Sequence, residues 1–200
     1  MKRVILSSAL AAAVMASPAM AHTGLGMAGL GTASGFMAGF GHPIGGLDHV
    51  LAMVAVGILA VQMGGRAVWQ IPSTFVAMMI FGGFLGISAV AVPFVEQGIL
   101  GSVMILGAVV AMGRKLPVGL AASMVGVLAV FHGHAHGTEM PLDASGLEYG
   151  IGFALATAML HGAGIALSMV SQKIAARVAP MAVRVSGAAI SIGGVALAVA

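Results

Sequence analysis

Long apolar runs separated by short polar breaks make up most of the chain after residue 46. Six runs are candidate membrane-spanning helices: Leu47–Met63, Ile71–Val95, Gln97–Met112, Leu116–Phe131, Leu147–Val170 and Ala182–Ala200. A hydrocarbon core of ~30 Å needs about 20 apolar residues in a helix, so the third and fourth runs are short. Transmembrane β-strands would alternate polar and apolar residues, and these runs do not. The pattern therefore predicts an all-α polytopic membrane protein with six transmembrane helices.

The first 21 residues, Met1–Ala21, have the pattern of a secretory signal peptide. Lys2 and Arg3 form a basic start, and the apolar stretch Val4–Ala16 follows. The segment ends with Ala19-x-Ala21, which is typical of a cleavage site. We therefore expect residues 1–21 to be removed and residues 22–200 to form a single transmembrane domain. An uncleaved signal anchor is the alternative.

Charge predicts how the six spans are oriented. Basic residues fall between alternate spans, at Arg66, Arg114, Lys115, Lys173 and Arg177, with Arg184 at the start of the last span. Acidic residues fall in the other loops or at their ends, at Asp48, Glu96, Glu139, Asp143 and Glu148, and most histidines accompany them. Basic loops favour the cytoplasmic side. We therefore expect a bacterial inner-membrane protein whose histidine-rich loop and C-terminus face the periplasm.

The segment Thr23–Gly41 is a seventh, weaker candidate. It holds seven glycines and few large apolar residues, and glycine is a poor helix former. A full crossing here would reverse every basic loop. We therefore expect it to be re-entrant or tucked among the other helices, as protein-covered backbone can be at membrane depth. An ordinary seventh span is the alternative. Gly82 with Gly86, and Gly146 with Gly150, have the Gly-x-x-x-Gly spacing of close helix packing.

Composition excludes several classes of protein. Hydrophobic residues make up 60% of the chain and charged residues only 6%, whereas soluble domains carry roughly 25% charged residues. A soluble domain, a disordered chain and a coiled coil are therefore excluded, and the lipid bilayer is the expected surrounding. With no cysteine in the sequence, disulfides and thiolate metal sites are absent. The net charge of +3 comes from scattered residues, so no nucleic-acid partner is expected.

The densest polar cluster precedes the first long span. His42, Asp48 and His49 offer two imidazoles and a carboxylate within eight residues. That donor set suits a borderline divalent ion such as Ni²⁺, Co²⁺ or Zn²⁺. The other interpretation is a plain polar turn in which Asp48 is the helix N-cap.

A second tract follows the fourth span and holds His132, His134, His136 and Glu139. Three imidazoles and a carboxylate at this spacing are typical of a short metal-binding tract. If the helix continues, His132 and His136 share a face and His134 points away. In an extended loop all three converge. A fortuitous polar loop is the remaining alternative.

Three further residues, His161, Glu96 and His22, complete the candidate metal ligands. His161 lies in the middle of a span, where a buried imidazole is costly and indicates function by default; an interhelical hydrogen bond is the alternative. Glu96 lies on the acidic side and could attract cations along an entry path, as could Glu148, which is not among the candidate ligands. An interfacial polar cap is the alternative for each of these two carboxylates. His22 would be the mature N-terminus after cleavage.

The chain resembles the HupE/UreJ family. The resemblance depends on the leader and on the run Gly39-x-x-His42-Pro43-x-x-Gly46-x-Asp48-His49-x-Leu51-Ala52-Met53-x-Ala55-Val56-Gly57. The tract His132–Glu139 and the patch Leu160-His161-x-x-Gly164 lie where that family has histidine-bearing segments. The resemblance implies a nickel permease of the kind often encoded beside hydrogenase or urease genes. It extends to His42, Asp48 and His49 and, in a loop that varies in the family, to His132, His134, His136 and Glu139.

The sequence thus predicts secondary transport of a divalent metal, most directly nickel, for maturation of a hydrogenase or urease. Cobalt or zinc transport is an alternative, as are a non-transporting metal-binding accessory protein and an intramembrane metalloenzyme. No His-Glu-x-x-His, Gly-x-Ser-x-Gly or nucleotide-binding Gly-x-x-x-x-Gly-Lys motif occurs, so neither an enzyme nor an intrinsic ATPase is expected. The ion would be cargo and not a tightly bound cofactor. Homo-oligomerisation stays open.

Overall fold

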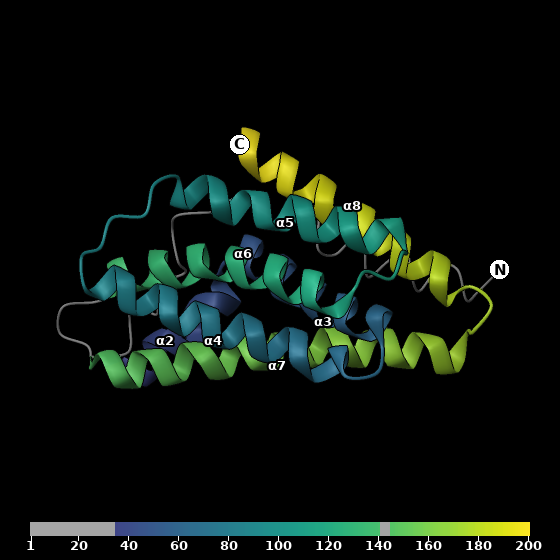
Figure 1. The fold of residues 1–200 in the computed structure, drawn as a ribbon, viewed down its shortest axis with the longest axis horizontal. Helices are drawn as coiled ribbons and strands as arrows, with labels where there is room; N and C mark the ends of the chain where they lie inside the picture. The colour runs from purple at the N-terminus through teal and green to yellow at the C-terminus, as the bar shows by residue number, and fades with distance from the viewer. Residues whose placement is uncertain (1–34, 141–144) are drawn as a thin grey trace.

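The computed structural model describes residues 35–140 and 145–200, which form seven helices and no strand. The helices are α2 (Gly35–Gly45), α3 (Leu47–Met63), α4 (Ala67–Ile87), α5 (Val95–Met112), α6 (Val118–Thr138), α7 (Gly146–Ile174) and α8 (Ala179–Val199). Helices α4 to α8 run roughly along the long axis of the molecule (Figure 1). The predicted signal peptide, His22 and residues 23–34 lie outside the described part of the chain.

The helices have the length and apolarity of membrane spans. Five of them, α4 to α8, can each cross a bilayer alone, and α2 with α3 qualifies as a pair bent by 80°. Large apolar side chains also cover outward faces; Phe84 is 67% exposed and Leu147 is 75% exposed. Exposed apolar surface on this scale marks contact with lipid. The chain is therefore an all-helical, polytopic membrane protein, with six spans if the bent pair is counted as one.

Several predicted boundaries differ from the structure. Helix α3 has the predicted bounds, but α4 ends at Ile87 and not at Val95. Ala89 and Phe94 have φ values of 55° and 58°, a left-handed conformation that breaks the helix between them. Helix α6 continues beyond the predicted end at Phe131 as far as Thr138. The second histidine tract is therefore helical and not an extended loop.

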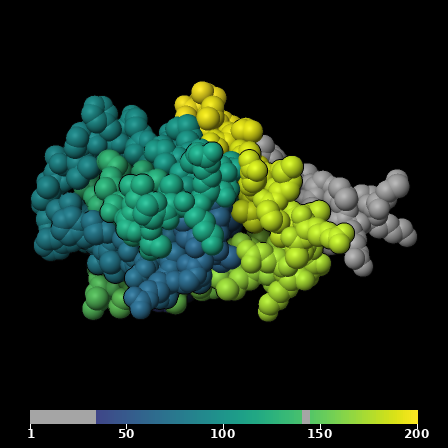
Figure 2. Space-filling model, turned by 45° about the vertical axis from the view of Figure 1, so that its right-hand side comes forward, coloured from purple at the N-terminus to yellow at the C-terminus, as the bar shows by residue number. Residues whose placement is uncertain are grey.

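Helix α3 is the centre of the bundle. It packs against five of the other described helices, α2, α4, α5, α7 and α8, and reaches α6 through the ring of His49. Its middle residues from Ala52 to Ala60 are almost all buried, including Met53, Val56 and Leu59. Little of α3 reaches the surface in the space-filling view (Figure 2). Polar groups at the start of this helix are consequently held inside the protein and away from lipid.

The described part of the glycine-rich segment is tucked against the bundle, as one of the two expectations had it. Helix α2 runs along the first turns of α7, where the backbone of Gly39 lies against that of Tyr149. The chain then turns at Gly46, the N-cap of α3. A Cβ at Gly46 would lie 2.8 Å from both Asp48 Oδ1 and His49 Nδ1. A side chain at Gly46 would therefore displace the polar groups of Asp48 and His49 from the positions that they hold.

Glycines join the other helices in pairs. Helices α4 and α6 meet at Gly82, Gly86, Gly133 and Gly137, α3 and α7 at Gly57 and Gly164, and α5 and α8 at Gly107 and Gly187. At each position an added Cβ would collide with the backbone of the partner helix. The Gly82–Gly86 prediction is thus confirmed. The Gly146–Gly150 prediction is wrong, because Gly150 faces open space.

Basic side chains and the clustered imidazole groups lie at opposite ends of the bundle. At the basic end, Arg184 Nε donates to Ala111 O at 3.0 Å, and Gln62 Nε2 donates to Arg114 O at 3.3 Å. At the histidine end, the start of α3 meets the last turns of α6 and the first turns of α7. The structure therefore separates the two ends as the alternation of charge predicted.

Candidate metal site

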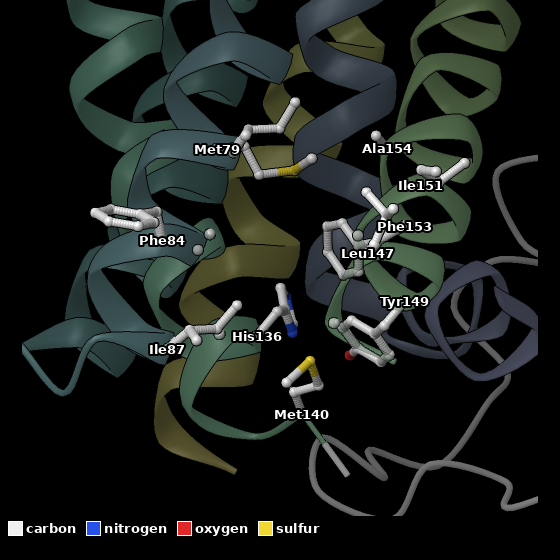
Figure 3. A pocket seen from close by; sticks show the side chains of 16 residues that line it. Met79, Phe84, Ile87, His136, Met140, Leu147, Tyr149, Ile151, Phe153 and Ala154 are labelled. Atoms are coloured by element: carbon white, nitrogen blue, oxygen red, sulfur yellow. The ribbon is translucent and has the colours of Figure 1, made fainter. Parts of the chain in front are cut away.

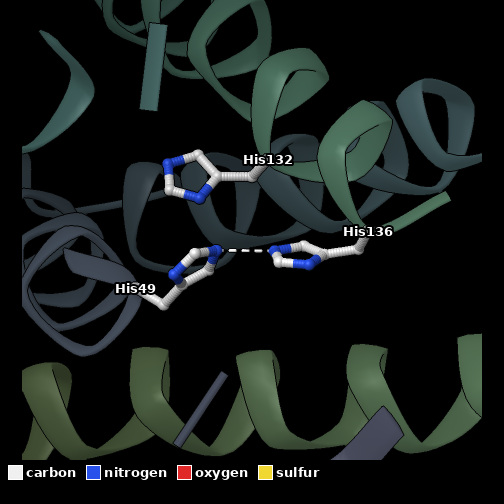
Figure 4. Close-up of side chains that lie close together, drawn as sticks. All are labelled: His49, His132 and His136. Carbon is white, nitrogen blue, oxygen red and sulfur yellow. Dashed lines mark hydrogen bonds between the residues drawn. The ribbon is translucent and has the colours of Figure 1, made fainter. Parts of the chain in front are cut away.

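Three buried imidazoles meet at the histidine end. His49 comes from the first turn of α3, and His132 and His136 lie one helical turn apart on α6 (Figure 4). Each offers a ring nitrogen, and these atoms all lie within 4.8 Å of one another. None of the three residues is more than 6% exposed. We call this group the three-histidine cluster.

His49 is fixed by the residue that precedes it. Its Nδ1–H donates to Asp48 Oδ1 at 2.7 Å, and its backbone N–H donates to the same oxygen at 2.8 Å. The N-cap of α3 is Gly46, and Asp48 lies inside the first turn of the helix. The interpretation of Asp48 as the N-cap is therefore wrong. A carboxylate on Nδ1 leaves Nε2 of His49 as the unprotonated atom that points into the cluster.

His136 faces His49 across the cluster. Because His49 Nε2 carries no proton, the hydrogen bond between the two rings has His136 Nε2–H as its donor. On the other side of the ring, His136 Nδ1 lies 4.0 Å from Glu139 Oε2. An ion can replace the bridging proton, and the ring can then carry its proton on Nδ1 toward Glu139.

A second, more exposed group shares His136. His42, His136 and Glu139 also have ligand atoms within 4.8 Å of one another. His42 Nε2 lies 4.0 Å from Glu139 Oε2, and these side chains are 39% and 52% exposed. The ring of His42 is 4.5 Å from that of His136. His136 thus connects an exposed group of ligands to the buried cluster.

His132 is held by a residue that the sequence did not single out. Its Nε2 lies 2.7 Å from Ser102 Oγ on α5. The ring of Phe75 on α4 also packs against it, with 5.6 Å between centroids. The available signal for Ser102 was a hydroxyl in an apolar span, which is too common to predict a role. Nothing in the sequence pattern marks Phe75.

His161 is buried apart from the cluster. It is 1% exposed, and neither ring nitrogen has a hydrogen-bond partner among the described residues. Its ring meets the ring of Phe75 edge to face, with 5.0 Å between centroids. Phe75 therefore contacts the rings of both His132 and His161. The predicted interhelical hydrogen bond, the alternative to a functional role, does not occur within the described structure.

The remaining predicted ligands lie outside the cluster. His134 points away from His132 and His136, as a continuous helix requires, and its Nε2–H donates to Val90 O at 2.8 Å. Glu96 and Glu148 are exposed at the starts of α5 and α7. His22 lies outside the described residues. Of the predicted set, the structure brings together His42, His49, His132, His136 and Glu139, with Asp48 behind His49.

An apolar cavity of about 300 Å³ adjoins His136 between α4, α6 and α7. Its wall includes Met79, Phe84, Met140 and Tyr149, and His136 is the imidazole that reaches it (Figure 3). Low polarity beside a ligand lowers the local dielectric and strengthens its interaction with a cation. The cavity wall therefore favours inner-sphere binding by the imidazole over hydration.

Comparisons with known proteins agree with the predicted resemblance. A family model described as "HupE / UreJ protein" matches residues 10–197. A curated relative, "Protein HupE" from Rhizobium leguminosarum bv. viciae, is 48% identical over 155 residues, which are 76% of this chain and 81% of the relative. No solved structure matches the chain. The resemblance drawn from the histidine motifs is confirmed.

Proposed function

The chain belongs to the HupE/UreJ family, and from that premise we propose that it carries a divalent transition-metal ion, most directly Ni²⁺, into the cell across the bacterial inner membrane. The observation that carries this proposal is the three-histidine cluster, buried at one end of a membrane-spanning bundle. Ionisable groups at membrane depth are costly and mark ion pathways. The cargo would serve the maturation of a nickel enzyme such as a hydrogenase or a urease.

The ligand chemistry supports a borderline ion in transit. The cluster offers imidazole nitrogens, which suit Ni²⁺, Co²⁺ and Zn²⁺, and the sequence holds no thiolate that would retain the ion. Bond lengths of about 2.1 Å are typical for imidazole on such ions. The three ring nitrogens lie within 4.8 Å of one another, so the rings would have to draw closer together around one ion. Binding strong enough to dehydrate the ion but weak enough to release it suits a permease.

The order of burial suggests the route. Glu96 and Glu148 place exposed negative charge at the histidine end, which concentrates cations there. The partly exposed His42 and Glu139 receive the ion, and the shared ligand His136 passes it to the cluster. His161 lies farther along α7 toward the basic end, behind Phe75. Each step exchanges one ligand and avoids full rehydration inside the membrane.

The proposed orientation also supplies the driving force. With the histidine end in the periplasm and the basic end in the cytoplasm, the ion moves down the membrane potential. That potential is worth ~2.3 kcal/mol per elementary charge for each 100 mV. A divalent ion therefore needs no other coupling to enter when its outside concentration is not far below that inside.

Uptake by proteoliposomes tests the proposal. The full-length protein is reconstituted with a metal-sensitive dye inside, and Ni²⁺, Co²⁺ and Zn²⁺ are offered separately under an inside-negative potential. We expect Ni²⁺ influx that collapses with the potential and that is lost in His49→Ala. Metal binding without influx in the wild type would instead support the accessory-protein alternative. Influx that is unchanged in His49→Ala would contradict a route through the cluster.

Transport selectivity is read in the same vesicles by competition. Excess Co²⁺ or Zn²⁺ is added with a low concentration of labelled Ni²⁺, and the initial rate of nickel influx is compared. Weak inhibition would support nickel as the cargo. Strong inhibition accompanied by influx of the competitor would identify a broader permease or one of the other metals.

A further inference from the structure

Ser102 makes two hydrogen bonds inside the bundle, although α5 is otherwise apolar along this face. The side chain is fully buried, next to Val103 and one turn from Leu106. Its Oγ lies 2.6 Å from Ile99 O, on its own helix, and 2.7 Å from His132 Nε2, on α6. This is the hydrogen bond by which α5 reaches the three-histidine cluster.

Counting protons decides the direction of both hydrogen bonds. A serine hydroxyl has one hydrogen to donate, whereas the carbonyl of Ile99 can only accept. At 2.6 Å the hydroxyl hydrogen must lie between Oγ and that carbonyl, because two oxygens without a proton between them repel at this distance. The Oγ atom therefore accepts from its other neighbour, and His132 Nε2–H is the donor.

The opposite arrangement is unfavourable at two positions. If Ser102 donated to His132 Nε2, the proton of the neutral ring would lie on Nδ1. That atom is buried and has no hydrogen-bond partner among the described residues. A buried donor without an acceptor costs about 1–3 kcal/mol. As an unprotonated lone pair, the same Nδ1 points toward His49 and is available to an ion (Figure 4).

We propose that Ser102 is a positioning residue that holds the proton of His132 on Nε2 and thereby presents Nδ1 of His132 as the ligand atom of the cluster. This inference rests on the proposed function for the presence of an ion. The cluster would then bind its cargo through Nδ1 of His132 and Nε2 of His49. The two rings are thus oriented by different groups, a neutral hydroxyl behind one and a carboxylate behind the other.

The difference between those two partners has a chemical consequence. A carboxylate behind a ligating imidazole makes it a better donor. A hydroxyl fixes the tautomer and ring plane without adding negative charge. His49 is therefore the stronger ligand and His132 the weaker one, on the side of the cluster that faces Phe75 and His161. An ion leaving toward His161 would break its weaker bond last.

Nitrogen NMR tests the assignment directly. The full-length protein, labelled with ¹⁵N-histidine, is reconstituted in liposomes, and His132 is identified by the signal missing from His132→Gln. Without metal, we expect the His132 proton on Nε2. After addition of ¹¹³Cd²⁺ as the probe, we expect cadmium coupling to Nδ1 of His132 and to Nε2 of His49. A proton on Nδ1 in the metal-free protein, or cadmium on Nε2 of His132, would overturn the inference.

The metal-free spectrum separates this inference from the proposed function. If His132 carries its proton on Nε2 but neither Ni²⁺ nor Cd²⁺ binds to the wild type, the metal-site proposal and the ligand assignment both fall. If metal binds while the His132 proton lies on Nδ1, the role of Ser102 falls and the transport proposal stands.

Variants of the hydroxyl give a second, independent measurement. Ser102→Ala should weaken Ni²⁺ binding by about 10–100-fold, as loss of an outer hydrogen-bond partner does in other sites, and should leave the His132 tautomer mixed. Ser102→Thr keeps a hydroxyl and should restore both properties to within a few-fold. Ser168→Ala removes another buried hydroxyl, on α7, and should change neither the Ni²⁺ affinity nor the His132 tautomer. Wild-type affinity and tautomer in Ser102→Ala would contradict the proposal, and the wild-type spectrum decides it if that variant does not fold.

Discussion

The three-histidine cluster and His161 are buried to a similar degree but differ in what holds their rings. Every ring of the cluster has an oxygen nearby, from Asp48, Ser102 or Glu139. The ring of His161 has only the edge-to-face contact with Phe75, and both its nitrogens lack partners within the described structure. The first arrangement fixes tautomers and directions before an ion arrives. In the second arrangement no hydrogen bond of the described structure fixes the imidazole, which suits brief contact with a moving ion more than selection of that ion.

Removing a cluster ligand should have the largest effect. His132→Ala and His136→Ala should each weaken Ni²⁺ binding by more than about 100-fold, since losing a ligand should exceed the 10–100-fold cost of losing its outer partner. His134→Ala, from the same tract, is the matched control and should bind almost normally, because His134 points away toward Val90. Isothermal titration of the purified proteins measures all three. Equal losses in the three variants would mean that the tract acts as a flexible loop.

Crowding the α4–α6 contact should break the cluster without touching a ligand. A Cβ at Gly133 would collide with the backbone of Met79, and overpacking of this kind costs on the order of 1–3 kcal/mol. We expect Gly133→Ala to lower the thermal unfolding temperature and to abolish the stabilisation that Ni²⁺ gives the wild type. Gly119 faces open space on the same helix. Gly119→Ala should therefore leave both the thermal unfolding temperature and the stabilisation by Ni²⁺ unchanged. A fully nickel-responsive Gly133→Ala would show that the site tolerates displacement of α6.

Changing the residue behind His49 should have an intermediate effect. Asp48→Ala should reduce nickel affinity by about 10–100-fold, because the ring loses the oxygen that orients it. Asp48→Asn keeps an oxygen that can accept from Nδ1–H, so it should lose less. Competition with a metal-sensitive dye gives both dissociation constants. An Asn variant as damaged as the Ala variant would indicate that the negative charge, or direct ligation by Asp48, matters more than ring orientation.

Changing His161 should have the smallest effect on binding and a visible effect on flux. His161→Phe fills the space of the ring without its nitrogens. We expect an unchanged dissociation constant for Ni²⁺ at the cluster and a slower initial rate of influx in proteoliposomes. Binding weakened as much as in His132→Ala would place His161 within the selecting site. An influx rate equal to that of the wild type would show that His161 is not on the route of the ion.

Local signals in the sequence predicted the membrane class, the bounds of α3 and the residues of the two histidine motifs. They failed where the environment of a residue decides its role. Hydropathy ends the fourth span at Phe131 because imidazoles count as polar, yet His132 and His136 face the protein interior and the helix continues to Thr138. Gly133 and Gly137 of the same tract are also four residues apart, and both pack on the backbone of α4. The tract thus combines two patterns with the same helical spacing: His132 and His136 face the cluster, and Gly133 and Gly137 pack against α4.

Hydrogen bonds between residues far apart in the sequence could not be predicted, for a different reason. The hydrogen bond between Ser102 and His132 joins residues on two helices, and a lone hydroxyl in an apolar span has no pattern that names its partner. The interpretation of Asp48 as the N-cap failed because the helix begins earlier than that role requires, with Gly46 as the N-cap. Asp48 Oδ1 instead accepts from both the backbone N–H and the imidazole of His49.

The glycine contacts that join the helices in pairs have a mechanical consequence. His132 and His136 belong to the α4–α6 pair, whereas His49 belongs to the α3–α7 pair. Sliding one pair against the other leaves the spacing of the first two imidazoles unchanged and alters their distance from the third. A bound ion would therefore link the α4–α6 pair to the α3–α7 pair. The two pairs would be held together in the metal-loaded protein and could slide against each other in the metal-free protein. The force needed to separate the two helix pairs should therefore be higher in the metal-loaded protein than in the metal-free one.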